Sequence, residues 1–174
     1  MAASTKPHNN DGAASASIRG AARLSAVQAI YQLDATSVPV ERIVAEFVQH
    51  RLPEFLEPIS GNPAGREFFS KLVMGVARGR NALDVLIEGA LAEGWTIERL
   101  DRVLHSILRC GAYEIAMCED IPPRVAISEY VDIARAFFNG NEPGFVNGVL
   151  DSLARSKRAD EMKARPGDAP AEPG

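Results

Sequence analysis

Two arginines near the start of the chain are spaced so that both can contact one anionic ligand. Arg19 and Arg23 are four residues apart and would lie one above the other on a helix. They share the azimuth of Val27 and Ile30, the apolar side of the same segment. We therefore expect this helix to project beyond the core at its first turns and to present two guanidinium groups to phosphate. The alternative is two surface arginines that pair with nearby acids.

A third arginine interrupts an apolar segment. Arg109 lies among small and apolar side chains within residues 107–114. A long cation in such surroundings either pairs with a carboxylate or lies at the rim of a groove where an anion can bind. From the residues alone, pairing with a carboxylate is the simpler interpretation.

Phe145 and Asn147 stand at the beginning of the last predicted helix, directly after a loop rich in glycine and proline. An aromatic ring beside an amide can stack on an unpaired base and hydrogen-bond to its edge. Alternatively, Phe145 is a core residue, and Gly148 is a glycine where two helices pack closely. The residues alone leave both interpretations open.

Metal binding and catalysis have no pattern to support them. His8, His50 and His105 are scattered, and Cys110 and Cys118 are eight residues apart. These spacings match no common zinc or redox motif, so we expect both cysteines to be small core residues. The carboxylates are distributed as on solvated helix faces. The sequence therefore predicts no catalytic residue, no metal and no cofactor.

The elements that must position these residues are predicted to be helices. Gly94 is a plausible helix end, and Thr96 can cap the helix that follows. Gly75 and Gly79 follow no strand, so close approach of another helix explains them better than a phosphate loop. The pattern predicts an all-α fold of six or seven helices, with apolar residues at helical spacing over residues 17–33, 43–48, 63–94, 96–121, 127–138 and 143–153.

Length and composition favour one compact domain with two tails. The chain has 174 residues, of which 46% are hydrophobic and 24% charged. Residues 1–16 and 159–174 lack a hydrophobic period, so we expect disordered tails around a helical domain at 17–158. No apolar segment approaches the roughly 20 residues of a membrane span. Two cysteines are too few for a disulfide framework, which favours a reducing cytoplasmic setting.

The net charge of −4 is unevenly distributed. Residues 34–69 and 91–120 each carry six acidic and three basic side chains, whereas residues 1–33 and 139–158 are mildly basic. An acidic total therefore remains compatible with one positively charged face.

Four segments follow one another along the chain, at residues 23–33, 108–115, 121–129 and 145–151. In their order and spacing they resemble the NusB family of bacterial transcription antitermination factors, although the third has Ser128 where the family usually has asparagine. The resemblance covers about residues 17–155.

The resemblance implies an all-helical fold of two packed sub-bundles and a small RNA-binding adaptor. Proteins of this family pair with a small-subunit ribosomal protein, NusE, and bind the single-stranded boxA element of ribosomal RNA leader transcripts. The pair joins the elongating RNA polymerase complex and suppresses premature termination. Neither catalysis nor a cofactor is expected, and the expected location is the cytoplasm.

The resemblance also assigns residues to sites. The arginine-rich start of the family falls on residues 19–23, where close relatives can have three consecutive arginines and this chain has Arg19-Gly20-Ala21. Because two cations are missing, we expect the salt dependence of RNA binding to be shallower, with a slope lower by roughly two. Four other basic side chains can compensate for the missing arginines: Lys6, Arg155, Lys157 and Arg158. The residues expected to bind RNA are Arg19, Arg23, Gln28, Arg109, Phe145 and Asn147, and the residue expected to face NusE is Tyr31.

Three alternatives stay open. NusB-like domains also resemble the RNA-binding module of ribosomal RNA cytosine methyltransferases, although this chain contains no α/β cofactor domain with a glycine-rich loop. A helical protein–protein adaptor without an RNA role is the second. A homodimer that occludes its own RNA face is the third.

Overall fold

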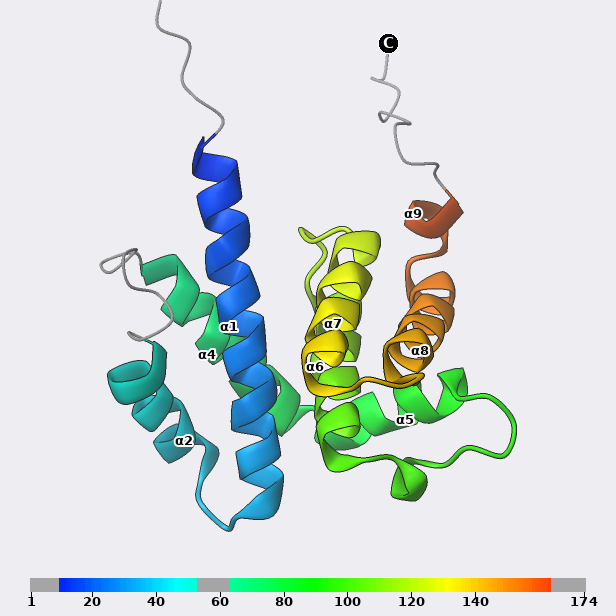
Figure 1. Ribbon diagram of the computed structural model, residues 1–174, viewed down its shortest axis with the longest axis horizontal. Helices are drawn as coiled ribbons and strands as arrows, with labels where there is room; N and C mark the ends of the chain where they lie inside the picture. Colours follow the sequence, from blue (N-terminus) through cyan, green and yellow to red (C-terminus); the bar gives the residue numbers. More distant parts are fainter. Residues whose placement is uncertain (1–9, 53–62, 164–174) are drawn as a thin grey trace, which may run out of the picture. The chain divides into compact units, whose positions relative to one another are not determined.

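The computed structural model describes residues 10–52 and 63–163, with side chains from residue 17 onward. Within these ranges it contains eight α-helices, two short helical turns and no strand (Figure 1). The predicted all-α class is confirmed. The chain divides into two compact units, residues 1–73 and 74–174.

The first unit contains α1 (Asn10–Ala35), α2 (Val40–Glu46), the π-helical turn η1 (Phe47–Arg51) and the beginning of α4 (Pro63–Arg78). Helix α1 begins inside the segment predicted to be a tail. Because that segment is rich in alanine, the strongest helix former, the helix can extend backward from its packed part.

The core of the first unit is built on one stripe of α1. Ile18, Ala22, Ala26 and Ile30 are spaced four apart and are at most 5% exposed. Small alanine side chains allow neighbouring helices to approach closely. The rings of Phe47 and Phe69 stack with centroids 5.6 Å apart and join η1 to α4.

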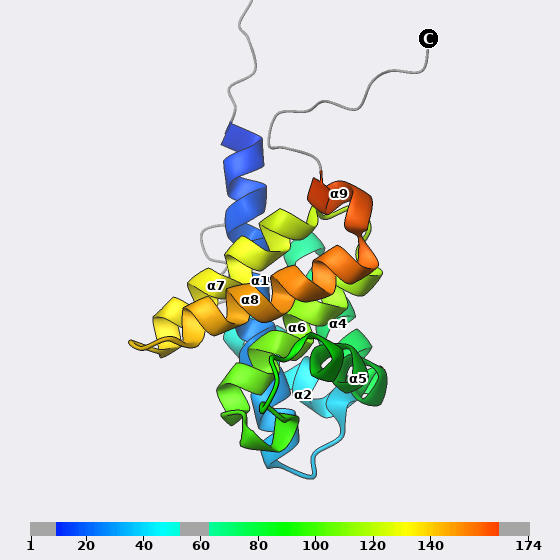
Figure 2. The same cartoon turned by 90° about the vertical axis from the view of Figure 1, so that its right-hand side faces the viewer.

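The second unit is built around one central helix. Helix α6 (Arg102–Met117) packs against α5 (Arg80–Ala90), α7 (Pro123–Phe137) and α8 (Glu142–Lys157) (Figure 2). A helix enclosed in this way is buried on several sides, and the segment 106–112 of α6 is buried without interruption. A Cβ atom at Gly111 would lie 2.7 Å from Leu150 Cδ1, so glycine permits the close packing of α6 on α8.

The predicted helix over residues 63–94 is two helices. Helix α4 ends at Arg78 and α5 begins at Arg80, with Gly79 between them at φ −95° and ψ 12°. Glycine weakens a helix at this point because its backbone is the least restricted. Gly75 allows close approach, as predicted, since a Cβ atom there would collide with the ring of Tyr113.

The predicted cap of α6 was wrong. Thr96 makes no capping hydrogen bond and precedes a 3-10 turn, η2 (Ile97–Arg99). Helix α6 begins instead after Asp101, whose Oδ1 accepts hydrogen bonds from the backbone N–H groups of Val103 (2.8 Å) and Leu104 (3.3 Å). A carboxylate at this position also interacts favourably with the positive end of the helix dipole, which a threonine hydroxyl does less well.

A short helix, α9 (Ala159–Lys163), lies in the segment predicted to be the second tail. Met162 is buried, and its carbonyl accepts a hydrogen bond of 2.6 Å from Arg124 Nη2. Arg158, just before α9, donates to the carbonyls of Ile121 (2.7 Å) and Cys118 (3.3 Å) beyond the end of α6. These arginines therefore fix the chain up to residue 163. No described helix is long and apolar enough to cross a membrane.

Candidate nucleic-acid interface

The two arginines of α1 meet at one aromatic ring. The guanidinium carbons of Arg19 and Arg23 lie 5.6 and 5.3 Å from the ring centroid of Phe68, on α4. Both contacts lie within the first unit. Each is a cation–π interaction, which attracts the guanidinium to the ring face and fixes its position.

The two arginines differ in burial. Arg19 is exposed, whereas Arg23 is only 2% exposed. The prediction that the helix projects beyond the core at both residues was therefore wrong for Arg23. The apolar stripe continues to Ile18, and Phe68 covers this turn, which a pattern read along α1 alone cannot reveal. The RNA-binding role of both residues stays a prediction.

Gln28 and Tyr31 lie further along α1. Gln28 is half-buried, and Tyr31 is 41% exposed. An exposed tyrosine presents both an aromatic surface and a hydroxyl group to another molecule. This position is compatible with the predicted contact to NusE, which stays a prediction.

Arg109 is paired with a carboxylate inside the second unit. Its Nε donates to Asp84 Oδ1 at 2.8 Å and its Nη2 donates to Asp84 Oδ2 at 2.7 Å. His105, one turn earlier on α6, places its Nε2 2.8 Å from Asp84 Oδ1. Arg109 is only 6% exposed. The structure therefore shows the first of the two interpretations, in which Arg109 pairs with a carboxylate. A role of Arg109 in RNA binding stays a prediction.

The environment of Asp84 favours its charged form. Burial alone would raise the pKa of the carboxyl group, but hydrogen bonds from Arg109 and His105, together with the positive charge of Arg109, outweigh burial. The pKa of Asp84 therefore lies below its usual value. The pair connects α5 to α6 and is a structural link as much as a charged site.

Phe145 lies in the first turn of α8 and is half-buried. Its ring contacts Trp95, from the loop after α5, with centroids 5.1 Å apart and planes at 53°. Arg99 places its guanidinium carbon 5.2 Å from the centroid of Trp95. Reasoning from the sequence missed Trp95 and Arg99, although a lone tryptophan beside a glycine in a predicted loop was an available signal.

Asn147 is exposed and lines a shallow groove between α7 and α8. Two arginines of the groove have protein partners: Arg124 donates to the carbonyl of Met162, and Arg135 Nη1 donates to Asp132 Oδ1 at 2.8 Å. Asp151 also lines the groove and accepts from Arg155 at 2.8 Å. Phe145 and Asn147 therefore lie on different faces of α8, Phe145 against Trp95 and Asn147 in the groove.

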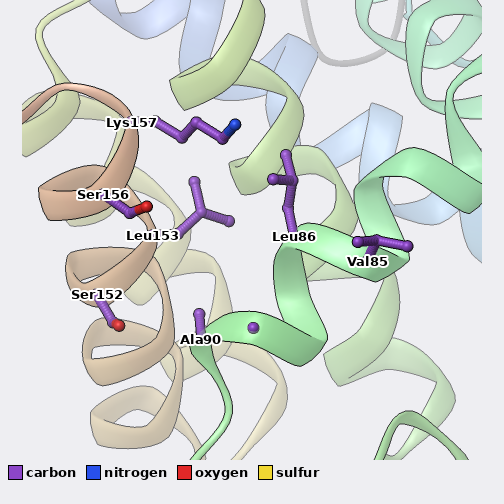
Figure 3. A pocket seen from close by; sticks show the side chains of 8 residues that line it. Val85, Leu86, Ala90, Ser152, Leu153, Ser156 and Lys157 are labelled. Carbon is purple, nitrogen blue, oxygen red and sulfur yellow. The ribbon is translucent and has the colours of Figure 1, made fainter.

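The other basic residues named above are partly engaged. Arg155 pairs with Asp151, and Arg158 holds carbonyls at the end of α6. Lys157 is exposed and lines a small pocket between α5 and α8, with Ser152 and Ser156 on the same helix (Figure 3). Lys6 lies outside the described residues.

Cys110 and Cys118 are buried, in agreement with a core role. In the part of the chain that the structure describes, no group of three or more histidine, cysteine, aspartate or glutamate side chains could hold a metal ion.

Comparison with known proteins decides the family. Residues 20–155 match the family model described as the NusB family. The chain belongs to the NusB family. Transcription antitermination protein NusB of Rhodopseudomonas palustris (strain BisB18) is 49% identical over 144 residues, which cover 83% of this chain and 85% of that protein. The NusB protein of Sphingopyxis alaskensis is 45% identical over 140 residues, which cover 80% and 94% of the two chains.

Solved NusB structures share the fold. NusB of T. maritima matches with a TM-score of 0.69 at 28% identity and covers 84% of this chain and 97% of that one. A crystal structure of the antitermination factors NusB and NusE in complex with double-stranded RNA matches with a TM-score of 0.65 at 25% identity, covering 80% and 97%. The helical architecture described above is thus that of the family.

Proposed function

We propose that this NusB-family protein is a transcription antitermination factor that binds boxA-type single-stranded leader RNA together with NusE. The complex joins the elongating RNA polymerase and supports transcription of ribosomal RNA. The observation that carries the proposal is the family match over residues 20–155, which includes most of the described helices. The role is one of binding, without a catalytic step, and it is exercised in the cytoplasm, where bacterial transcription takes place.

The residues proposed to bind RNA fall into two groups by unit. Arg19, Arg23 and Gln28 belong to α1 of the first unit. Phe145 and Asn147 belong to α8 of the second unit, and Arg109 to α6. Exposed Arg19 supports a phosphate contact, the ring of Phe145 supports stacking on an unpaired base, and the exposed amide of Asn147 supports a separate hydrogen bond to the RNA.

RNA binding by the isolated chain is expected to be weak. Arg19 is the exposed member of the arginine pair, while Arg23 is buried against Phe68. One phosphate contact contributes a slope of about 0.7 to the salt dependence of binding to a single strand. NusE must then supply much of the remaining affinity.

The direct test is a titration of labelled boxA-type RNA with this protein, alone and with NusE, at several salt concentrations. Arg19→Ala and Asn147→Ala should weaken binding, whereas Arg42→Ala, an exposed arginine of α2, should not. If the first two variants bind as the unmodified protein does in both formats, the proposed RNA surface is wrong.

The NusE contact is tested separately. Tyr31→Ala should lower the affinity for NusE and leave RNA binding by the isolated chain unchanged. Met117→Ala removes an exposed apolar side chain of the second unit and serves as the control. Equal NusE affinity for both variants would contradict the assignment of Tyr31.

A further inference from the structure

A tryptophan outside the family-derived set enlarges the aromatic surface at the start of α8. Trp95 is 44% exposed, although a side chain of this size is usually well covered. Its ring leans on that of Phe145, with centroids 5.1 Å apart and planes at 53°. The two rings form one surface, of which the indole is the more exposed part.

A cation lies on the same surface. The guanidinium carbon of Arg99 is 5.2 Å from the indole centroid, and the residue is exposed. No carboxylate among the described residues forms an ion pair with Arg99. Its positive charge is therefore available to an incoming anion beside an aromatic face.

The loop that carries the tryptophan is held in place. Gly94 has φ +87°, in the left-handed region that glycine tolerates. The backbone N–H of Trp95 donates to the carbonyl of Ala92 at 3.1 Å, and Arg99 Nη1 donates to the carbonyl of Gly94 at 2.6 Å. A ring fixed in this way loses little conformational freedom when it binds a ligand.

We propose that Trp95 and Arg99, with Phe145, form a stacking platform for unpaired bases of the bound RNA. The indole stacks on one base beyond the base at Phe145, and Arg99 contacts a phosphate beside it. Exposed aromatic rings interleaved with cations are the means by which proteins hold single strands, whereas paired bases in a duplex do not offer their faces. The platform extends the proposed RNA surface and rests on the proposed function.

The chain contains a single tryptophan, so its fluorescence reports on the platform directly. We expect single-stranded boxA-type RNA to quench the emission of the isolated protein at low salt, with the same midpoint as the anisotropy of the labelled RNA. A duplex of the same sequence should quench less. Unchanged emission when the anisotropy shows saturation would overturn the platform.

Substitutions separate stacking from loop packing. Trp95→Leu should weaken RNA binding about tenfold, and Trp95→Phe, which keeps an aromatic face, less than about threefold. Arg99→Gln should lower the salt slope by about 0.7. Val85→Ala, which truncates an exposed apolar side chain of α5, is the matched control and should bind normally. Thermal unfolding of each variant shows whether the fold is retained.

A scan of the RNA with single abasic positions supplies a readout that a purely structural role would not move. One abasic position should weaken binding to the unmodified protein about tenfold but have little further effect on Trp95→Leu. Independent effects at every position would contradict a stacked base.

The outcomes distinguish the platform from the function on which it rests. If Trp95→Leu binds RNA normally while Arg19→Ala and Phe145→Ala bind poorly, the platform is wrong and RNA binding stands. If Trp95→Leu loses affinity for NusE alone, the surface contacts protein and the proposal falls. If the unmodified protein binds no boxA-type RNA even with NusE, both proposals fall.

Discussion

Arg109 and Asp84 form a two-point ion pair that links α6 to α5, with donor–acceptor distances of 2.8 and 2.7 Å. The side chain of Arg109 is 8% exposed and that of Asp84 is 23% exposed, so water screens the pair less than a surface pair. His105 contacts the same carboxylate. This arrangement gives the charge of Asp84 a measurable role in the stability of the second unit.

Replacing Asp84 by asparagine should destabilise the protein. The substitution removes the negative charge to which the buried guanidinium of Arg109 donates two hydrogen bonds, and we expect a loss of about 2–3 kcal/mol in the free energy of unfolding. Urea denaturation measures it. The control is Asp132→Asn, which breaks an ion pair with Arg135 whose members are both 65% exposed and should cost less than about 1 kcal/mol. Equal losses in the two variants would contradict a special role for Asp84.

The same pair predicts a pH dependence. Because the folded-state pKa of Asp84 lies below its unfolded value, its contribution is fully present above the unfolded pKa, near 3.9. As pH falls through the lower folded pKa, that contribution is lost. The stability difference between the unmodified protein and Asp84→Asn should therefore shrink as the pH falls below about 4. A difference that grows on acidification would show that the pKa is raised instead.

Gly75 and Gly89 should respond in opposite ways to alanine. A Cβ atom at Gly75 collides with the ring of Tyr113, and Gly75→Ala should cost about 1–3 kcal/mol. At Gly89, in α5, nothing lies within 4 Å of the added atom, so Gly89→Ala should stabilise by up to about 1 kcal/mol. Thermal unfolding of the two variants compares them directly. Similar effects of the same sign would refute this packing argument.

A buried hydrogen bond between Tyr130 and Glu114 should contribute to stability. The hydroxyl of Tyr130 donates to Glu114 Oε2 at 2.7 Å, and both residues are fully buried. Tyr130→Phe removes this donor from a buried carboxyl group and should lower the free energy of unfolding by about 1–3 kcal/mol. Tyr31→Phe, at an exposed position, should change stability by less than about 0.5 kcal/mol.

Substitutions of Arg19 and Arg23 should differ in their effect on stability. Arg19→Ala removes an exposed cation and should reduce the salt slope of RNA binding by about 0.7 with little effect on the unfolding midpoint. Arg23→Ala removes a guanidinium packed on Phe68 and should also lower the unfolding midpoint by several degrees. Equal midpoints for the two variants would contradict their different burial.

Local patterns in the sequence predicted the all-α class and most of the helices. Apolar spacing indicated the all-α class, and the absence of a strand before Gly75 indicated helix packing there. Such patterns depend on neighbours within a few residues, which is the range over which helix periodicity acts. The division at Gly79 and the cap at Asp101 were missed because several residues nearby could have ended or begun a helix.

The side-chain partners were harder to predict because they come from distant segments. Phe68 lies 45 positions after Arg23, and Asp84 lies 25 positions before Arg109. Nothing in the local pattern of α1 or α6 reveals which residue will cover an arginine. Trp95 meets Phe145 across 50 positions for the same reason. The family resemblance supplied candidate residues, but their burial and partners required the folded structure.

Arg158 also has a consequence for synthesis of the protein. The carbonyl of Ile121, just past the end of α6, accepts a hydrogen bond from Arg158, which lies 37 positions later in the chain. A nascent chain that has emerged from the ribosome only as far as Lys157 lacks this donor. The segment that follows α6 therefore receives this contact late in translation, after the residues of the first unit have emerged.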